Sequence, residues 1–209
     1  RPLVISMIAD SAYQGLGLAI EHQSLTHRSE NVTSALGVLV PLLKALLAGA
    51  EPRRTISEYA ERVHPPQITG EQLFAAYRDH QGPGNIPKRE MWKFHTLLAD
   101  GPYEVDRLVQ EGAEPAVINH LFATACYPEH GLPLLLYFAK AHNVDVESAL
   151  LANANAGGDN VHRGMVLGIL VGAASKELPA DLKQGLIAFD EIQTEIEAFS
   201  DIALSGKAI

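Results

Sequence analysis

The sequence predicts an all-α fold, a compact multi-helix bundle, on three observations. Hydrophobic residues make up 47% of the 209 residues and aromatic residues only 6%, so the core must be built mainly from aliphatic side chains. This composition favours helices. No segment shows sustained alternation of polar and apolar residues between hairpin turns. Apolar stretches with helical spacing instead follow one another, separated by short breaks rich in Gly, Pro or polar residues.

The first half of the chain is predicted to hold five helices. Ser29 is a predicted N-cap for the second of them, and Pro41 inside that helix should kink or split it. Thr55 and Glu58 have the spacing of a capping box, which predicts that the third helix opens there. The helices are expected at 3–22, 32–47, from 55 onward, 69–79 and 88–99, with a Gly- and Pro-rich loop at 81–85.

Helices also fill the second half, separated by shorter breaks. A long apolar helix follows Pro128, and Pro133 is a candidate kink within it. Two glycines stand directly before a later helix, whose first residue is Asn160. The expected ranges are 103–110, 115–125, 128–142, 144–154, 160–174, 180–187 and 191–204.

Charge and cysteine content narrow the function classes. Sixteen basic and 25 acidic residues give a net charge of −9. Because a nucleic-acid binder needs clustered cations, we expect no nucleic-acid partner. The apolar run at 36–43 ends at Lys44, so no membrane association is expected. Cys126 is the single cysteine and allows no disulfide within the chain, which favours a reducing compartment and predicts a cytoplasmic location.

The stretch at 153–164 carries the clearest chemical signal. Gly157 and Gly158 precede Asp159 at the start of a predicted helix. One interpretation is that Asp159 caps the helix. The other is that Asp159 is a metal ligand and that the two glycines let the backbone approach a bound molecule. The spacing supports both interpretations equally. His162 and Arg163 follow three and four residues later, so we expect them on the same side of the helix as Asp159.

This stretch resembles the carboxyl-terminal signature of the ADP-ribosylglycohydrolase family. That signature reads roughly G-G-D-T-D-T, followed by a helix with G-x-L-x-G-A, which 168–173 matches. Asn155 corresponds to an Asn that commonly lies two residues before the glycines. Thr26 and His27 resemble a Thr-His element in the middle of such chains, and the helix at 131–139 resembles the one before the metal motif.

The resemblance implies an all-α fold of ADP-ribosylglycohydrolase type and a hydrolase activity. Members hold two divalent cations, usually magnesium, between an amino-terminal Thr/Ser-Asp-Asp motif and this carboxyl-terminal motif. The metals position ADP-ribose for hydrolysis of the bond at its ribose C1″. Hard cations prefer carboxylate and hydroxyl oxygens, so the chemistry is consistent with the motif.

The sequence departs from the family pattern in two ways. Val161 stands at the second Asp and His162 at the final Thr, so a magnesium pair would lose a ligand. Asp159 and His162 are therefore candidate ligands for a divalent metal (magnesium, manganese or zinc), or the metal is absent. No Thr/Ser-Asp-Asp motif is present. We therefore expect 1–209 to be a single domain, the later part of a larger fold, with a complementary amino-terminal chain or a homo-oligomer as its partner.

Two functional hypotheses remain open. The first is a hydrolase acting on an ADP-ribosyl or related N- or O-glycosidic or polar small molecule, with Asp159 as ligand or base and His162 as acid, base or ligand. In it, Arg163 holds an anion and Asn155 orients the first turn. The other predicted substrate-binding residues are His27, Glu129, His130, Gly157, Gly158 and Asn160. The second hypothesis is a non-catalytic ligand-binding or structural member of the family that has lost the two-metal site.

The stretch at 126–131 brings a cysteine, a glutamate and a histidine close together in sequence. A catalytic thiol needs a base within hydrogen-bond reach, which sequence neighbours rarely provide. Cys126 is therefore predicted to be a buried cysteine at a helix junction.

Overall fold

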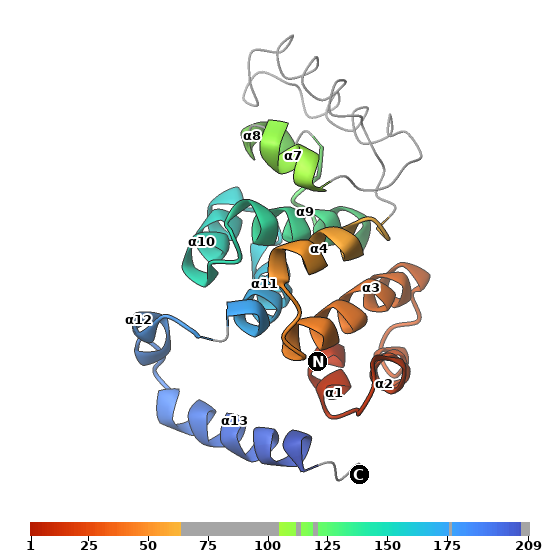
Figure 1. Ribbon diagram of the computed structural model, residues 1–209, viewed down its shortest axis with the longest axis vertical. Helices are drawn as coiled ribbons and strands as arrows, with labels where there is room; N and C mark the ends of the chain where they lie inside the picture. The colour runs from red at the N-terminus through yellow and green to blue at the C-terminus, as the bar shows by residue number, and fades with distance from the viewer. Residues whose placement is uncertain (64–104, 112–113, 119–120, 176, 206–209) are drawn as a thin grey trace.

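The computed structural model describes residues 1–63, 105–111, 114–118, 121–175 and 177–205 (Figure 1). The helices predicted at 69–79 and 88–99 and the loop at 81–85 lie outside these residues. The described part is helical and its only bridge pairing is isolated, between Ile118 and Phe122, so the all-α prediction is confirmed. The helices are α1 Pro2–Met7, α2 Ala12–Ser24, α3 Glu30–Leu47, α4 Pro52–Ala60, α7 Val105–Glu111, α8 Glu114–Val117, α9 Pro128–Ala141, α10 Val146–Ala156, α11 Asn160–Ser175, α12 Ala180–Gln184 and α13 Phe189–Leu204.

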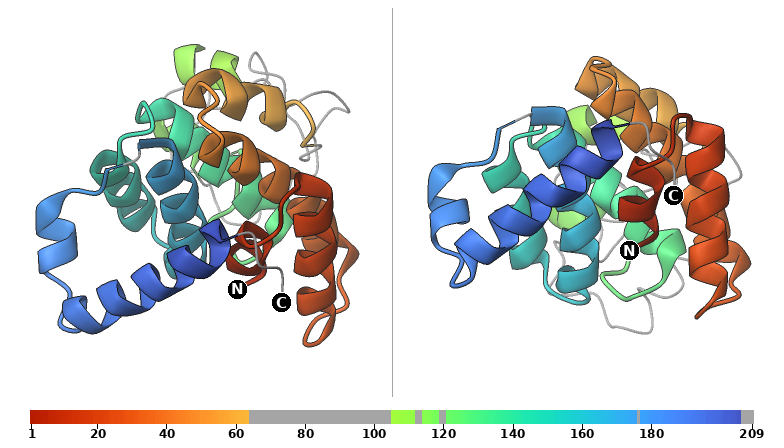
Figure 2. Two further views of the ribbon diagram at one scale, coloured as in Figure 1. Left: turned by 60° about the horizontal axis from the view of Figure 1, so that its bottom comes forward. Right: turned by 90° about the horizontal axis from the view of Figure 1, so that it is seen from below.

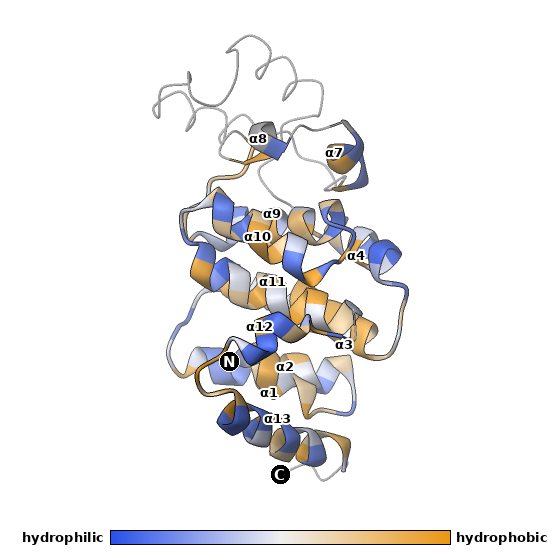
Figure 3. Ribbon diagram, turned by 90° about the vertical axis from the view of Figure 1, so that its left-hand side faces the viewer, coloured by the Kyte–Doolittle hydropathy of each residue, from blue (hydrophilic) through white to orange (hydrophobic). Residues whose placement is uncertain are grey.

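Helix α3 forms the centre of the core. It packs against α1, α2, α4, α9 and α11, and it is largely orange in the hydropathy view of Figure 3. Its 18 residues have a mean hydropathy of 1.4, so by length and composition alone the helix could cross a membrane. The apolar run at 36–43, on which the membrane expectation rested, covers only part of this helix. Its buried side chains face neighbouring helices, as those of a core helix do.

The two sequence signals within α3 have different outcomes. Ser29 is its N-cap as predicted, because its side chain accepts a hydrogen bond from the backbone N–H of Val32. The helix is continuous through Pro41, so this proline does not split it. Helix α9 likewise continues through Pro133.

Two helix predictions in the first half of the chain are wrong. The helix expected at 3–22 is divided, because Ser11 begins a new helix by accepting a hydrogen bond from the backbone N–H of Gln14 at 3.2 Å. Helix α4 opens at Glu51 rather than Thr55. The Glu51 carboxylate accepts from the N–H groups of Arg53 and Arg54 at 3.0 and 2.7 Å, and these bonds supply the N-cap one turn earlier.

The prediction for 115–125 is also wrong in extent. Helix α8 ends at Val117, and residues 123–127 form an irregular segment that leads into α9. The next predicted helices are confirmed in position by α9, α10 and α11. This irregular segment matters for function, because it lies against the turn between α10 and α11.

A buried lysine joins three helices. Lys140 of α9 is 5% exposed. Its Nζ donates to the backbone oxygen of Arg53 at 2.7 Å and to the Ser57 hydroxyl, and it lies 2.7 Å from Oδ1 of Asp106. These contacts tie α4 and α7 to α9, which carries one wall of the candidate site.

The last two helices lie outside the core. Neither α12 nor α13 has a buried residue. Figures 1 and 2 show α13 crossing the end of the bundle near α1. These helices therefore add little to the stability of the core in the described structure.

Candidate functional site

The turn between α10 and α11 is held by its two glycines. Gly157 and Gly158 have φ values of +68° and +63°, which residues with a side chain rarely adopt. A Cβ atom on Gly158 would lie 2.1 Å from the backbone oxygen of Thr124. The N–H of Asp159 donates to that same oxygen at 2.7 Å. The glycines therefore let the turn approach the 123–127 segment closely.

A buried arginine supports this turn from inside. Arg163 is 5% exposed, and its Nε donates to Oδ1 of Asn153 at 2.6 Å. Its Nη2 donates to the backbone oxygen of Gly157 at 2.9 Å. Burial lowers the pKa of Arg163, and the nearby Asp159 charge opposes that effect. Because these bonds occupy the guanidinium, the geometry favours a positioning role over the predicted anion-binding role.

Asn153 belongs to the site although the sequence pattern did not single it out. It is 3% exposed, and its Nδ2 donates to the backbone oxygen of Asn160 at 2.8 Å. It thus orients the first turn of α11, the task expected of Asn155. Asn155 itself is exposed. The side chain of Asn160 adds a further link by donating to the backbone oxygen of Ala154 at 3.1 Å.

Asp159 and His162 form a hydrogen-bonded pair, as their spacing predicts. Nδ1 of His162 lies 2.6 Å from Oδ1 of Asp159. An ionised carboxylate only accepts hydrogen bonds, so Nδ1 must carry the proton and Nε2 is left as the basic nitrogen. The His162 side chain is 73% exposed and that of Asp159 26% exposed, so Nε2 is open to a bound molecule.

This pair borders a cavity of about 170 Å³ between α3, α9 and α11. The apolar part of the lining includes Leu39, Leu132, Leu135 and Val166. The polar part includes Cys126, Asp159, His162 and Arg163. Cys126 is exposed, so the prediction of a buried cysteine is wrong. The cavity is the place where the motif residues and the 123–127 segment meet.

The other predicted binding residues fall in three places. Glu129 lines an adjoining cavity of about 160 Å³, where its Oε2 accepts from the Asn31 amide at 3.4 Å. His130 is buried, and its Nδ1 accepts a hydrogen bond from the N–H of Ala123 at 3.4 Å. This bond links α9 to the irregular segment before it. His27 is exposed and lies outside both linings, with its Nδ1 2.9 Å from the Thr26 hydroxyl.

The described residues do not fit a pair of divalent cations. Within the part of the chain that the structure describes, no group of three or more His, Cys, Asp or Glu side chains could hold a metal. Val161 is 68% exposed and offers no ligand atom. Asp159 and His162 remain the two candidate ligands, fewer than a closed metal site requires.

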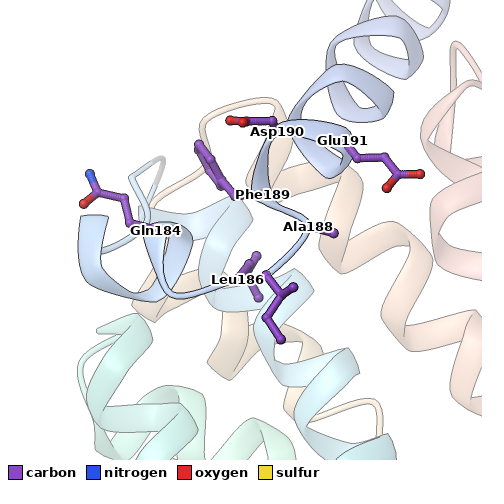
Figure 4. Close-up of a pocket in the computed structure, with 7 residues that line it drawn as sticks. Gln184, Leu186, Ala188, Phe189, Asp190 and Glu191 are labelled. Carbon is purple, nitrogen blue, oxygen red and sulfur yellow. The ribbon is translucent and has the colours of Figure 1, made fainter.

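A larger hollow of about 520 Å³ lies elsewhere, in the turn between α12 and α13 (Figure 4). Its lining includes Leu186, Phe189, Asp190 and Glu191. None of the predicted site residues takes part. It lies between α12 and α13, which have no buried residue, and its lining includes no residue of the motif, so its volume does not make it the functional site.

Comparison with known proteins identifies the family. A sequence model of ADP-ribosylglycohydrolase matches residues 2–207, nearly the whole chain. Neither the curated proteins nor the solved structures give a match. The matched region includes the turn, the Asp159–His162 pair and the cavity described above. The chain belongs to the ADP-ribosylglycohydrolase family.

Proposed function

We propose that the protein hydrolyses an N- or O-glycosidic bond in an ADP-ribosyl or related polar small molecule, with His162 and Asp159 as its acid–base pair. One observation carries this proposal. The turn that carries the family resemblance holds a hydrogen-bonded histidine and carboxylate, with Nδ1 of His162 2.6 Å from Oδ1 of Asp159, at the edge of a cavity. Family membership supplies the hydrolase class.

The pair supports proton transfer in a simple way. With Nδ1 bonded to Asp159, Nε2 of His162 can take a proton from a water molecule that attacks the glycosidic carbon. The Asp159 carboxylate stabilises the imidazolium that forms and fixes the ring orientation. The proton can then pass to the leaving group. Arg163 contributes indirectly, because it holds the turn that carries Asp159.

Metal chemistry is characteristic of the family, which generally depends on divalent cations. In this chain, Asp159 and His162 would hold a single softer cation such as manganese or zinc more readily than a magnesium pair. A complementary chain bearing a Thr/Ser-Asp-Asp motif would add the missing carboxylates. If a cation is bound through Nε2 of His162, that nitrogen cannot accept a proton, so the proton transfer proposed for His162 belongs to the metal-free site.

The test uses peptides that carry ADP-ribose through an N- or an O-glycosidic bond, with chromatographic detection of released ADP-ribose. Wild type is compared with Asp159→Asn and His162→Asn, with added magnesium, manganese or zinc and with a chelator. Val161→Ala is the matched control, because Val161 is an exposed apolar neighbour on the same turn. Equal release by wild type and His162→Asn would contradict the assignment.

The second candidate is a non-catalytic binding protein of the same family, favoured by Val161 at a ligand position. It predicts ADP-ribose binding without turnover. Calorimetry with ADP-ribose, run beside the release assay, separates the two functions.

A further inference from the structure

We propose that Cys126 is a nucleophilic thiol served by the His162–Asp159 pair, and that the cavity takes an activated acyl compound such as an ester or thioester with a short apolar acyl group. The proposal combines three groups on one cavity: an exposed thiol, an imidazole and the carboxylate that orients it. This is the nucleophile–base–carboxylate set of thiol acyl-transfer enzymes.

The fold brings these groups together from two separate segments. Cys126 lies in the irregular segment before α9, and Asp159 and His162 lie at the start of α11. The bond from the Asp159 N–H to the Thr124 oxygen fixes the two segments side by side, two residues before the thiol. Cys126 also directly precedes Tyr127, the N-cap of the 14-residue helix α9.

The thiol and the imidazole line the cavity without a direct hydrogen bond between them in the described structure. The His162 side chain is 73% exposed, so its ring has room to change rotamer. Such loose geometry is common in the absence of substrate.

The cavity lining suggests the substrate class. Leu39, Leu132 and Leu135 supply apolar surface, which suits a short acyl group. In the reaction, the sulfur of Cys126 forms a bond to the acyl carbon and the bond to the leaving group breaks. The thiol proton passes to Nε2 of His162 and then to the leaving group. Water hydrolyses the resulting thioester, releasing the acid and restoring the thiol.

This inference goes beyond the proposed glycosidase function, and it is tested without any glycoside. Cys126 is the single cysteine, so alkylation of the folded chain by iodoacetamide reports on one site by intact mass. Rates are measured across neutral pH for wild type, His162→Asn, Asp159→Asn and the control Val161→Ala. Circular dichroism confirms that each variant is folded.

Near neutral pH we expect His162→Asn to react about tenfold more slowly than wild type, with Val161→Ala unchanged. Equal rates for wild type and His162→Asn would overturn the proposal. With p-nitrophenyl acetate, wild type should release one early equivalent of nitrophenolate and acquire an acetyl group on Cys126, and Cys126→Ser should not. No acetylated wild type would overturn the acyl assignment, even if glycosidic hydrolysis is observed.

Discussion

The Nε atom of Arg163 lies 2.6 Å from Oδ1 of Asn153, and this buried contact joins the first turn of α11 to the last turns of α10. Its other nitrogens reach the backbone oxygens of Gly157 and Thr124. The Cζ atom also lies 5.9 Å from the centre of the Phe138 ring. One side chain therefore sets the position of the turn that carries Asp159.

Replacing this arginine should destabilise the protein and disturb the site. Arg163→Met fills much of the same volume but leaves buried oxygens without donors, so we expect the free energy of unfolding to fall by about 2–3 kcal/mol. Arg163→Lys should not rescue it, because a single ammonium cannot replace the planar fork. Urea unfolding measures the free energy of unfolding of Arg163→Met and Arg163→Lys. Met165→Ala, at an exposed position on the same helix, is the control. Unchanged stability in Arg163→Met would contradict the role.

The two glycines of the turn should respond differently to alanine. A Cβ at Gly157 meets no atom within 4 Å, so Gly157→Ala should cost only the backbone strain of about 1–3 kcal/mol. Gly158→Ala adds a clash with the Thr124 oxygen, so it should cost more and displace Asp159. Thermal unfolding and the release assay on both variants give the comparison. Equal effects on activity would show that the close approach to Thr124 is unimportant.

The sequence predicted the helical class and the turn at 157–159 because glycine placement and helical spacing are local signals. It also predicted the Asp159–His162 pair, since residues three apart share a helix face. It could not predict that Thr124 meets the turn, because that contact depends on the end of α8 and on tertiary packing. One feature of the sequence could have indicated Asn153: it is an Asn inside a predicted helix, where an Asn side chain usually needs a specific hydrogen-bond partner.

The ion pair between Lys140 and Asp106 should make stability depend on pH. Burial raises the pKa of Asp106, but its bonds with Lys140 and Ser57 outweigh this and hold the pKa below its ordinary value of 3.8. A lowered folded-state pKa stabilises the protein above the unfolded pKa, and the effect is lost as the pH falls through the folded value. Asp106→Asn should cost up to about 1 kcal/mol near neutral pH, because the carboxylate is half exposed.

Urea unfolding at several pH values tests the contribution of Asp106. The difference between wild type and Asp106→Asn should shrink as the pH falls below about 4. Asp145→Asn is unsuitable as a control, because that carboxylate caps α10. Glu147→Gln, at an exposed position in α10, serves instead. A difference that is constant with pH would rule out the Asp106 charge as its source.

Restoring the second carboxylate of the motif should restore magnesium affinity. Val161 is 68% exposed in the first turn of α11, so Val161→Asp should fold, and a carboxylate there interacts favourably with the helix N-terminus. Together with Asp159 it would offer magnesium two hard oxygen ligands. We expect tighter magnesium binding by calorimetry than in wild type, by about tenfold, with Val161→Asn as the isosteric uncharged control. If Val161→Asp and Val161→Asn bind magnesium equally, the missing ligand at position 161 is not what weakens the metal site.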